Sequence, residues 1–411
     1  MTAPHPTAIV GAHVFDGHEL LPDTSVVIAA GRITGVGGAI PGDAQVVDAH
    51  GCTLLPGLID AHVHTGRAGL REALVFGVTT ELEMQGHWTA AQRRAVAQAD
   101  DLADLRSAGF GVTRRGGHPS HWFPDNAYPG MGDADDSGPV FVAPFASTPD
   151  EAIFVVDSLI RSGSDYIKIM VEDGHVLGAP GLPVLDPVVM KAAVHAAHEQ
   201  GKLVVAHALT VAATLAAVAA GVDGLTHLFV DGPATAHVVD VIAAAGVFVV
   251  PCLVLDSSIV GGNAAAFASD ERVRARAPES ALNLLRGSFD TYREGRFEDV
   301  LSSVFSLSEA GVDILVGTDA SPRVPGVAHG ASVHHELQLL TAAGLTPRQA
   351  LRAATSVPAT RFGLTDRGAI RPGMRADLVL TEGNPAVFAS DSLSLRQVWK
   401  RGVAVDLEPP S

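Results

Sequence analysis

The sequence predicts an α/β protein in which a (β/α)8 barrel carries a small β-sandwich domain formed from both ends of the chain. Two observations predict this fold. Between residues 56 and 364, apolar runs typical of strands alternate with longer runs of helical spacing. At both ends of the chain, short strand-like runs are separated by Gly, Pro and Asp. Strands that alternate with helices in this way are typical of a closed parallel barrel.

Both ends of the chain consist of short strand-like runs joined by turns. Residues 1–55 contain Thr7-Ala-Ile-Val, Ser25-Val-Val-Ile and Gln45-Val-Val. Residues 365–411 contain Ala376-Asp-Leu-Val-Leu and Leu395-Arg-Gln-Val-Trp. The simplest account is one composite β-sandwich domain built from residues 1–55 and 365–411, beside a barrel built from residues 56–364.

The alternation between residues 56 and 364 predicts the barrel elements. We expect strands over residues 57–62, 77–83, 109–115, 165–171, 202–207, 223–228, 246–253 and 312–317. We expect helices between them, including residues 89–107, 187–200, 210–220 and 329–343. Residues 255–300 are too long for a tight barrel connection and are rich in Arg, Asp, Glu and Ser. They predict a lid or insertion over a binding site, or else a solvated helical hairpin or a contact between subunits.

Composition and charge exclude several classes of function. The chain has 411 residues, of which 47% are hydrophobic and 18% charged, so it can bury a large core. The formal net charge of −17 disfavours nucleic acid and anionic membranes as partners. Apolar stretches such as residues 202–220 are broken by His and Thr, so we expect no membrane span. A small-molecule substrate is the remaining kind of partner, and a homo-oligomer is compatible with a barrel of this type.

The cysteines and the N-terminus indicate a cytoplasmic protein. Cys52 and Cys252 lie in different predicted strands and form neither a metal-ligand pair nor a disulfide framework, which fits a reducing compartment. The opening Met1-Thr-Ala-Pro-His-Pro has no basic region followed by an apolar core, so we expect no signal peptide.

Good metal ligands follow several predicted strands. His62 and His64 flank Val63 at period two, so both imidazoles leave the same face of a strand. Three further candidates each end a strand-like run, where barrel enzymes place catalytic groups: His207, His227 and Asp319. Each residue alone would be read as a hydrogen-bonded core histidine or a turn aspartate. Together at strand ends, they predict a metal site.

Lys168 stands in the strand-like run Tyr166-Ile-Lys-Ile-Met. Ile167 and Ile169 flank it, so alternation directs the lysine to the opposite face, the barrel interior. An ammonium group has no lone pair for a metal, and two dications would repel it strongly. Deprotonation and reaction with CO2 turn the lysine into a carbamate, whose carboxylate can bridge two metal ions. The set therefore predicts a binuclear metal hydrolase, whereas a lysine that reaches out to the surface is the simpler alternative.

Taken together, these motifs resemble the amidohydrolase superfamily over nearly the whole chain. The matching parts are Pro56-Gly-Leu-Ile-Asp-Ala-His-Val-His64, Lys168, His207, His227 and Gly317-Thr-Asp319, with Val27-Ile-Ala-Ala-Gly-Arg-Ile and Arg371-Pro-Gly-Met-Arg-Ala-Asp at the two ends. Tyr166-Ile-Lys-Ile-Met, Gly116-Gly-His118, His329-Gly and Glu336-Leu are similar to the branch that contains Xaa-Pro dipeptidases and ochratoxin-type amidases. The resemblance implies a TIM barrel with a flanking β-sandwich.

The resemblance also implies a role for each site residue. His62, His64 and Asp319 would bind one metal ion, His207 and His227 a second, and the carbamate of Lys168 would bridge them. The two divalent ions, with zinc the best match to nitrogen and oxygen ligands, would supply a bridging hydroxide and activate the carbonyl. Asp319 would act as general base and then acid. His118 would donate to the developing oxyanion.

Two loops depart from the branch, and both should rim the pocket. After Lys168 the chain reads Val171-Glu-Asp-Gly-His175 instead of a small Ala-Ser-Gly-Gly turn, and after His118 it reads Pro119-Ser-His-Trp-Phe-Pro. We expect substrate contacts from six residues: His118, His121, Trp122, His175, Arg323 and His329. A substrate carboxylate would need Arg114, Arg115 or Arg323, each of which is otherwise a solvated surface charge. Glu83 is either a support behind a ligand or part of the pocket wall.

Three functions remain open on the sequence. The first is hydrolysis of an amide C–N bond in a dipeptide or N-acyl amino acid type of substrate. The second is hydrolysis of a lactone, ester or carbamate by the same site. The third is a catalytically silent assembly protein on this fold, but such proteins lose ligands, and all six ligand positions are present.

Overall fold

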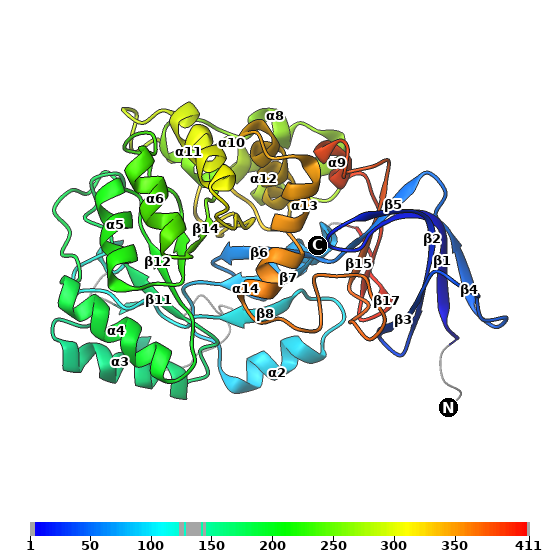
Figure 1. Cartoon of the computed structure of the whole chain (residues 1–411), viewed down its shortest axis with the longest axis horizontal. Helices are drawn as coiled ribbons and strands as arrows, with labels where there is room; N and C mark the ends of the chain where they lie inside the picture. Colours follow the sequence, from blue (N-terminus) through cyan, green and yellow to red (C-terminus); the bar gives the residue numbers. More distant parts are fainter. Residues whose placement is uncertain (1–4, 123–126, 129–140, 143–144, 409–411) are drawn as a thin grey trace.

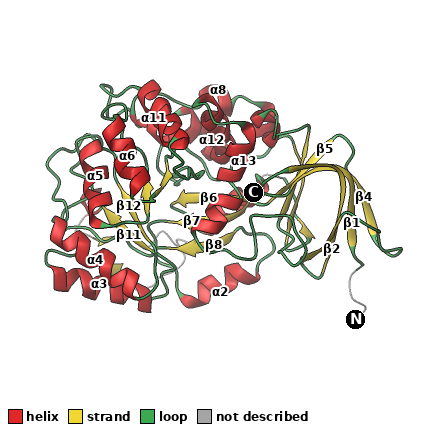
Figure 2. Cartoon of the chain, viewed as in Figure 1, coloured by secondary structure: helices red, strands yellow, loops and turns green. Residues whose placement is uncertain are grey.

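The computed structural model describes residues 5–122, 127–128, 141–142 and 145–408. It is a mixed α/β structure in which short parallel strands are surrounded by helices, as Figure 2 shows. No helix in the described ranges combines the length and the apolar composition that a membrane span requires. The predicted loop that departs from the branch after His118 lies partly outside the described residues, from residue 123 onward.

One eight-stranded sheet contains strands from both ends of the chain, and we call it the terminal sheet. Its strand order is β17-β16-β15-β5-β1-β2-β3, with β4 beside β1. The strands are β1 (Thr7–Phe15), β2 (Leu20–Ala29), β3 (Arg32–Val36), β4 (Gln45–Asp48), β5 (Cys52–Pro56), β15 (Leu378–Glu382), β16 (Leu395–Lys400) and β17 (Val403–Ala404). Figure 1 shows this sheet at one end of the molecule, opposite the helices α3 to α6.

The terminal sheet has a small core of its own. Antiparallel pairing of β5 with β15 places Leu54 opposite Leu380, and thereby joins the two ends of the chain. Ile9, Leu54 and Trp399 belong to this buried cluster, whereas neighbouring residues of the same strands, such as Leu55, belong to the large core. Burial of apolar side chains from both ends therefore holds the termini together.

Two parallel sheets lie in the middle of the chain. The strands of the first are β6 (Leu58–Val63), β7 (Val78–Glu83) and β8 (Asp104–Ser107), and those of the second are β11 (Ile167–Met170), β12 (Val204–His207), β13 (Gly224–Thr226) and β14 (Phe248–Val250). Isolated parallel bridges extend their edges: Val112 to Ile169, Val249 to Ile314, and Val63 to Ala320. Nearly every strand residue is buried, as expected for parallel strands covered on both faces.

Helices connect and cover these strands. They are α1 (Arg67–Val75), α2 (Ala90–Gln98), α3 (Pro149–Arg161), α4 (Pro187–Glu199), α5 (Val211–Ala220), α6 (Ala236–Ala244), α11 (Phe297–Glu309), α12 (Ala331–Ala342), α13 (Pro347–Ala353) and α14 (Ser356–Arg361). Residues 253–286 form the shorter helices α7 (Leu253–Ile259), α8 (Ala265–Ala268), α9 (Glu271–Arg274) and α10 (Glu279–Arg286). Several helices begin with a threonine cap, and Thr210, for example, accepts a hydrogen bond from the amide of Ala213.

Three predicted elements were wrong in extent. The helix predicted over residues 89–107 ends at Gln98, and Asp104–Ser107 forms β8 because it pairs in register with β7. The strands predicted over 109–115 and 312–317 are reduced to isolated bridges. A positive φ of 71° at Gly109 interrupts the first of them.

Buried charges join β8 to the segment that precedes β15. Asp104 Oδ2 lies 2.5 Å from Arg367 Nη1 and 2.8 Å from Arg375 Nη1. Burial raises the pKa of Asp104, but the positive charges of Lys400, Arg367 and Arg375 outweigh burial and hold this pKa well below its usual value. The carboxylate is therefore the counter-ion of buried guanidinium groups.

We expect Asp104→Asn to lower the free energy of unfolding by about 3–5 kcal/mol at neutral pH, because it removes the carboxylate that two buried guanidinium groups share. The pKa of Asp104 is lower in the folded state, so its contribution is present above the unfolded pKa of about 4 and is lost as the pH falls further. Urea denaturation of both proteins across this pH range tests the prediction. The exposed pair of Asp101 and Arg71 gives the control Asp101→Asn, with an expected cost of at most about 1 kcal/mol. Equal costs for the two variants would contradict it.

Candidate metal centre

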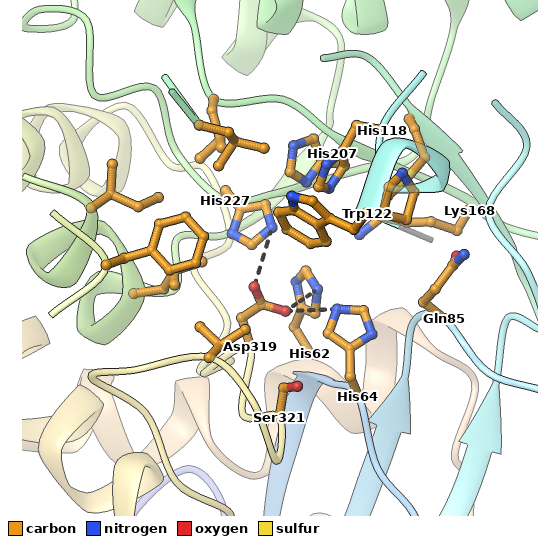
Figure 3. A pocket seen from close by; sticks show the side chains of 18 residues that line it. His62, His64, Gln85, His118, Trp122, Lys168, His207, His227, Asp319 and Ser321 are labelled. Atoms are coloured by element: carbon orange, nitrogen blue, oxygen red, sulfur yellow. Dashed lines mark ion pairs between the residues drawn. The ribbon is translucent and has the colours of Figure 1, made fainter. Parts of the chain in front are cut away.

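The structure brings all six predicted metal ligands into one pocket. His62, Lys168 and His207 stand in or at the end of their strands, His64 and His227 directly follow β6 and β13, and Asp319 precedes the bridge at Ala320. All six line the same pocket, together with His118 and Trp122 (Figure 3).

Asp319 lies at the meeting point of three histidines. Its Oδ1 is 3.1 Å from His62 Nε2 and 2.8 Å from His64 Nε2, and its Oδ2 is 4.0 Å from His227 Nε2. Burial raises the pKa of Asp319, but the neighbouring His62 and His64 outweigh burial and hold it well below its usual value. Burial, followed by the charge of Lys168, lowers the pKa of His62 to about 3. Asp319 is therefore a carboxylate, and the His62 that faces it is a neutral imidazole.

The second group contains His207, His227 and Lys168. The rings of His207 and His227 have centroids 4.7 Å apart, and the ring of His227 is 4.6 Å from that of His62. Lys168 is 1% exposed, and its Nζ donates a hydrogen bond to the hydroxyl of Thr226 on β13. Burial lowers the pKa of Lys168 to about 8, so the neutral amine is accessible near neutral pH.

Backbone geometry fixes these ligands at the strand ends. His227 and Asp319 have positive φ angles of 72° and 55°, which non-glycine residues rarely adopt and which concentrate at functional sites. Gly317 lets its segment pass close to β6, because a Cβ there would lie 2.2 Å from Val250 Cγ1 and 3.0 Å from His62 Cβ. His62 and Asp319 are thus brought together by local backbone conformation.

Asp60 is a supporting residue that sequence reasoning missed. Its Oδ1 accepts hydrogen bonds from the amides of His62 and Thr318, each at 3.1 Å, and its Oδ2 accepts one from the Thr318 hydroxyl at 2.6 Å. Burial, reinforced by Glu81, raises the pKa of Asp60 to about 8. Asp60 joins the end of β6 to the segment that carries Asp319.

Glu172 is a second support, and it stands in a loop that departs from the resembling branch. Its Oε2 lies 3.1 Å from His207 Nε2, and its Oε1 accepts a hydrogen bond from the amide of Gly174 at 2.7 Å. Only 3% of this glutamate is exposed. Glu172 therefore holds one nitrogen of His207 and leaves Nδ1 for another partner.

Cys252 is a further neighbour that was not expected at the site. Its Sγ lies 3.6 Å from His62 Nδ1. The ligand atoms of His62, His227 and Cys252 lie within 4.8 Å of one another, as do those of His62, His64 and Asp319. Spacing in the sequence gave no signal for this contact, because Cys252 is far from the histidines along the chain.

The residues present fit divalent metal ions. His62 Nε2 and Asp319 Oδ1 are buried side by side without a hydrogen bond of good geometry, and buried polar groups need a partner. A cation between them would satisfy both atoms. Imidazole and carboxylate are ligands of the kind that zinc binds in catalytic sites.

His118 and Trp122 form the wall beside the second group. The His118 ring stacks on that of His207 with centroids 4.7 Å apart, and Trp122 meets His118 edge to face at 4.7 Å. Burial, together with the neighbouring His207, lowers the pKa of His118 well below its usual value. The buried Nδ1 of His118 has no hydrogen-bond partner among the described residues.

The other predicted substrate contacts do not line this pocket in the described part of the chain. His121 is half-buried beside Trp122, His175 is exposed beside Tyr292, and Arg323 is exposed. His329 is buried, with its Nδ1 3.1 Å from Glu81. Each of them is therefore a neighbour of the pocket and not part of its wall.

Glu83 is buried behind the pocket and not in its wall. It accepts hydrogen bonds from the Ser107 hydroxyl at 2.5 Å and from the amide of Gln85 at 2.6 Å. Gln85 itself lines the pocket. Of the two interpretations open on the sequence, the supporting position matches these contacts.

Comparisons with known proteins identify the family. The model of the family described as "Amidohydrolase family" matches residues 53–405. The chain belongs to the amidohydrolase family. This result confirms the resemblance drawn from the sequence, and the chain is accordingly an enzyme of that family.

The relatives include hydrolases of the expected branch. Ochratoxinase of Aspergillus niger is 24% identical over 396 residues, which cover 85% of this chain and 75% of that protein. The structure of a Xaa-Pro dipeptidase with bound methionine superimposes with a TM-score of 0.75 at 24% identity, covering 98% of this chain and 100% of that one. A shorter match, 36% over 107 residues, links the chain to imidazolonepropionase of Deinococcus deserti, and the chain spans only about a quarter (25%) of that relative.

Proposed function

We propose that this protein is a binuclear metal-dependent hydrolase that cleaves an amide C–N bond. The observation that carries the proposal is the convergence of four imidazoles, one carboxylate and a buried lysine in a single pocket. A buried lysine ammonium gains no counter-ion from the neighbouring imidazoles. As a carbamate it would complete the ligand set.

We also propose the detailed fold that this site requires. The two parallel sheets, together with the bridges at Ile169, Ile314 and Ala320, would form a TIM barrel from residues 56–364. Residues 1–55 and 365–411 would form its flanking β-sandwich, in keeping with their separate core. Residues 255–300 would be an insertion over the site, since Leu255, Ile259 and Phe289 line the pocket.

Each ligand then has a defined place. His62, His64 and Asp319 would hold one ion, preferably zinc, and His207 and His227 would hold the second. The amine of Lys168 would add to CO2 with loss of one proton, and its new carboxylate would offer oxygen atoms to both ions. The burial of Lys168 and its hydrogen bond to the Thr226 hydroxyl, which accepts from Nζ, support this assignment.

Two side chains carry the proton chemistry. Bound metal ions would supply a hydroxide nucleophile at neutral pH and a Lewis acid for the carbonyl oxygen. Asp319 lies among the ligands with its carboxylate ionised, so it would accept the proton of the attacking water and pass it to the leaving nitrogen. His118 would donate its N–H to the developing oxyanion, because it is buried beside His207 with Nδ1 unpartnered.

We expect Glu172→Gln to weaken metal binding at the His207 and His227 group about 10–100-fold, since carboxylates that hold ligand histidines contribute this much. Equilibrium dialysis with metal analysis measures the effect. The neighbouring Asp173 is exposed, which makes Asp173→Asn a control of matched chemistry in the same loop. Unchanged metal affinity in Glu172→Gln would show that His207 does not depend on this contact.

Release of amine from a mixed library tests the reaction class. The library would hold dipeptides, N-acyl amino acids, neutral amides, lactones and esters, and products would be identified by mass spectrometry. We expect amide cleavage by enzyme supplied with zinc and bicarbonate, loss of cleavage after chelation, and its return with zinc. Cleavage confined to lactones or esters would replace the amidase by the alternative hydrolase.

A further inference from the structure

The pocket wall beyond the ligands is apolar. Its side chains surround about 690 Å³ of space free of protein atoms, part of which is open to solvent. The larger apolar side chains of the wall are Trp122, Leu177, Leu209, Leu255, Ile259 and Phe289. An apolar wall of this extent stabilises a bound substrate, because the apolar surfaces of the wall and of the substrate are both removed from water.

Two aromatic rings from distant segments face each other in this wall. Trp122 and Phe289 have ring centroids 6.4 Å apart at an angle of 63°. Phe289 is held in place, because its amide donates to the Ser258 hydroxyl at 2.7 Å and the amide of Asp290 donates to the Ser258 carbonyl at 2.8 Å. Trp122 is held through its ring contact with His118. Such rings are suited to a ring or a branched aliphatic group.

A substrate carboxylate would find no free cation in the described wall, where Lys168 is the one basic side chain apart from the histidines. Arg114 pairs with Asp186 at 2.7 Å, Arg115 lies over the ring of Phe145, and Arg323 is exposed and lies outside the wall. The sequence from residue 116 to residue 147 contains aspartates but neither lysine nor arginine. The buried Glu172 beside His207 would add repulsion. Burying an unpaired carboxylate here would be costly.

The remaining polar groups of the wall are neutral. Gln85 Oε1 accepts a hydrogen bond from the amide of Gly111 at 2.5 Å, and its buried Nε2 has no partner among the described residues. Ser321 contributes a hydroxyl. An amide N–H donor that is buried and unpartnered fits a neutral acceptor on the substrate, such as a carbonyl or ether oxygen.

We infer that the substrate is an uncharged amide with a ring or branched aliphatic group packed against Trp122 and Phe289, and that it bears no carboxylate. This inference rests on the proposed amide hydrolysis and narrows its substrate class. It places neutral carboxamides ahead of dipeptides and N-acyl amino acids.

A matched pair of compounds tests the inference. N-benzoylphenylalanine and N-(2-phenylethyl)benzamide differ only in one carboxylate. For the zinc-loaded enzyme, we expect the neutral compound to bind on the order of 10–100-fold more tightly, because N-benzoylphenylalanine would bury an unpaired carboxylate. Calorimetry gives both dissociation constants without requiring turnover, and kcat/KM is measured beside them.

Variants of the wall locate the effect. We expect Phe289→Ala to raise KM for the neutral amide about 10-fold with a smaller change in kcat, since a buried aromatic contact is lost. Phe154→Ala, on an exposed phenylalanine of α3, should change neither constant. Val324→Arg adds a cation to the pocket wall and should reduce or reverse the preference for the neutral compound.

The outcomes separate the inference from the proposed function. Tighter binding of the neutral compound supports the inference, and if neither compound is then cleaved, the proposed amide hydrolysis fails instead. Equal binding, or tighter binding of N-benzoylphenylalanine, overturns the inference whether or not amides are cleaved.

Discussion

Lys168→Ala should abolish catalysis, with kcat/KM falling by roughly 10³-fold or more, because it removes the group that would join the two metal sites. The variant should also retain fewer metal ions. Lys168 is 1% exposed and lines the pocket with every other proposed ligand, so its loss would act directly at the proposed metal centre. Metal analysis and hydrolysis rates of the same preparation measure both effects.

Two comparisons make this result specific. Lys191 is exposed on α4, so Lys191→Ala should leave activity and metal content unchanged. Acetate or propionate should restore part of the activity of Lys168→Ala, because a free carboxylate can take the place of the carbamate. Full activity of Lys168→Ala without added acid would contradict the bridging role.

Asp319→Asn should retain much of the bound metal and lose turnover by about 10²–10⁴-fold, the range expected when a general acid–base group is removed. The amide keeps an oxygen atom that can face His62 and His64, but it cannot accept the proton of the attacking water. The leaving nitrogen needs that proton, so esters with good leaving groups should lose less activity than amides. Single-turnover rates on both kinds of substrate measure the difference.

A control separates chemistry from folding. Asp240 is exposed on α6, and Asp240→Asn changes the same functional group far from the pocket. It should behave like the unchanged enzyme. If Asp319→Asn hydrolysed amides at the normal rate, another residue would have to be the base.

The positions of the ligands could be predicted because each follows an apolar run. Parallel strands are buried on both faces, so a His, Lys or Asp within or just after such a run needs a hydrogen-bond, charge or metal partner. Lys168 lines the pocket and its neighbours Ile167 and Ile169 do not, which places them on opposite faces of β11, as alternation predicted. The family itself was evident from these same motifs, and the family match confirms it.

The supports of the ligands could not be predicted in the same way. Asp60 contacts Thr318, and Glu172 contacts His207, across long separations in sequence that no periodic pattern encodes. The strands predicted over residues 109–115 and 312–317 were too long for a related reason. Both segments have strand-like composition, but each pairs at only a single position with β11 or β14. Contacts between segments distant in sequence determine both the supporting residues and the lengths of these strands.

The most direct test of the account is an anomalous-diffraction map from crystals grown with zinc and bicarbonate. We predict two peaks, one among His62, His64 and Asp319 and one between His207 and His227, with density for a carboxylate on Lys168 Nζ between them. A single peak held by His62, His227 and Cys252, whose ligand atoms also lie within 4.8 Å of one another, would contradict the binuclear centre.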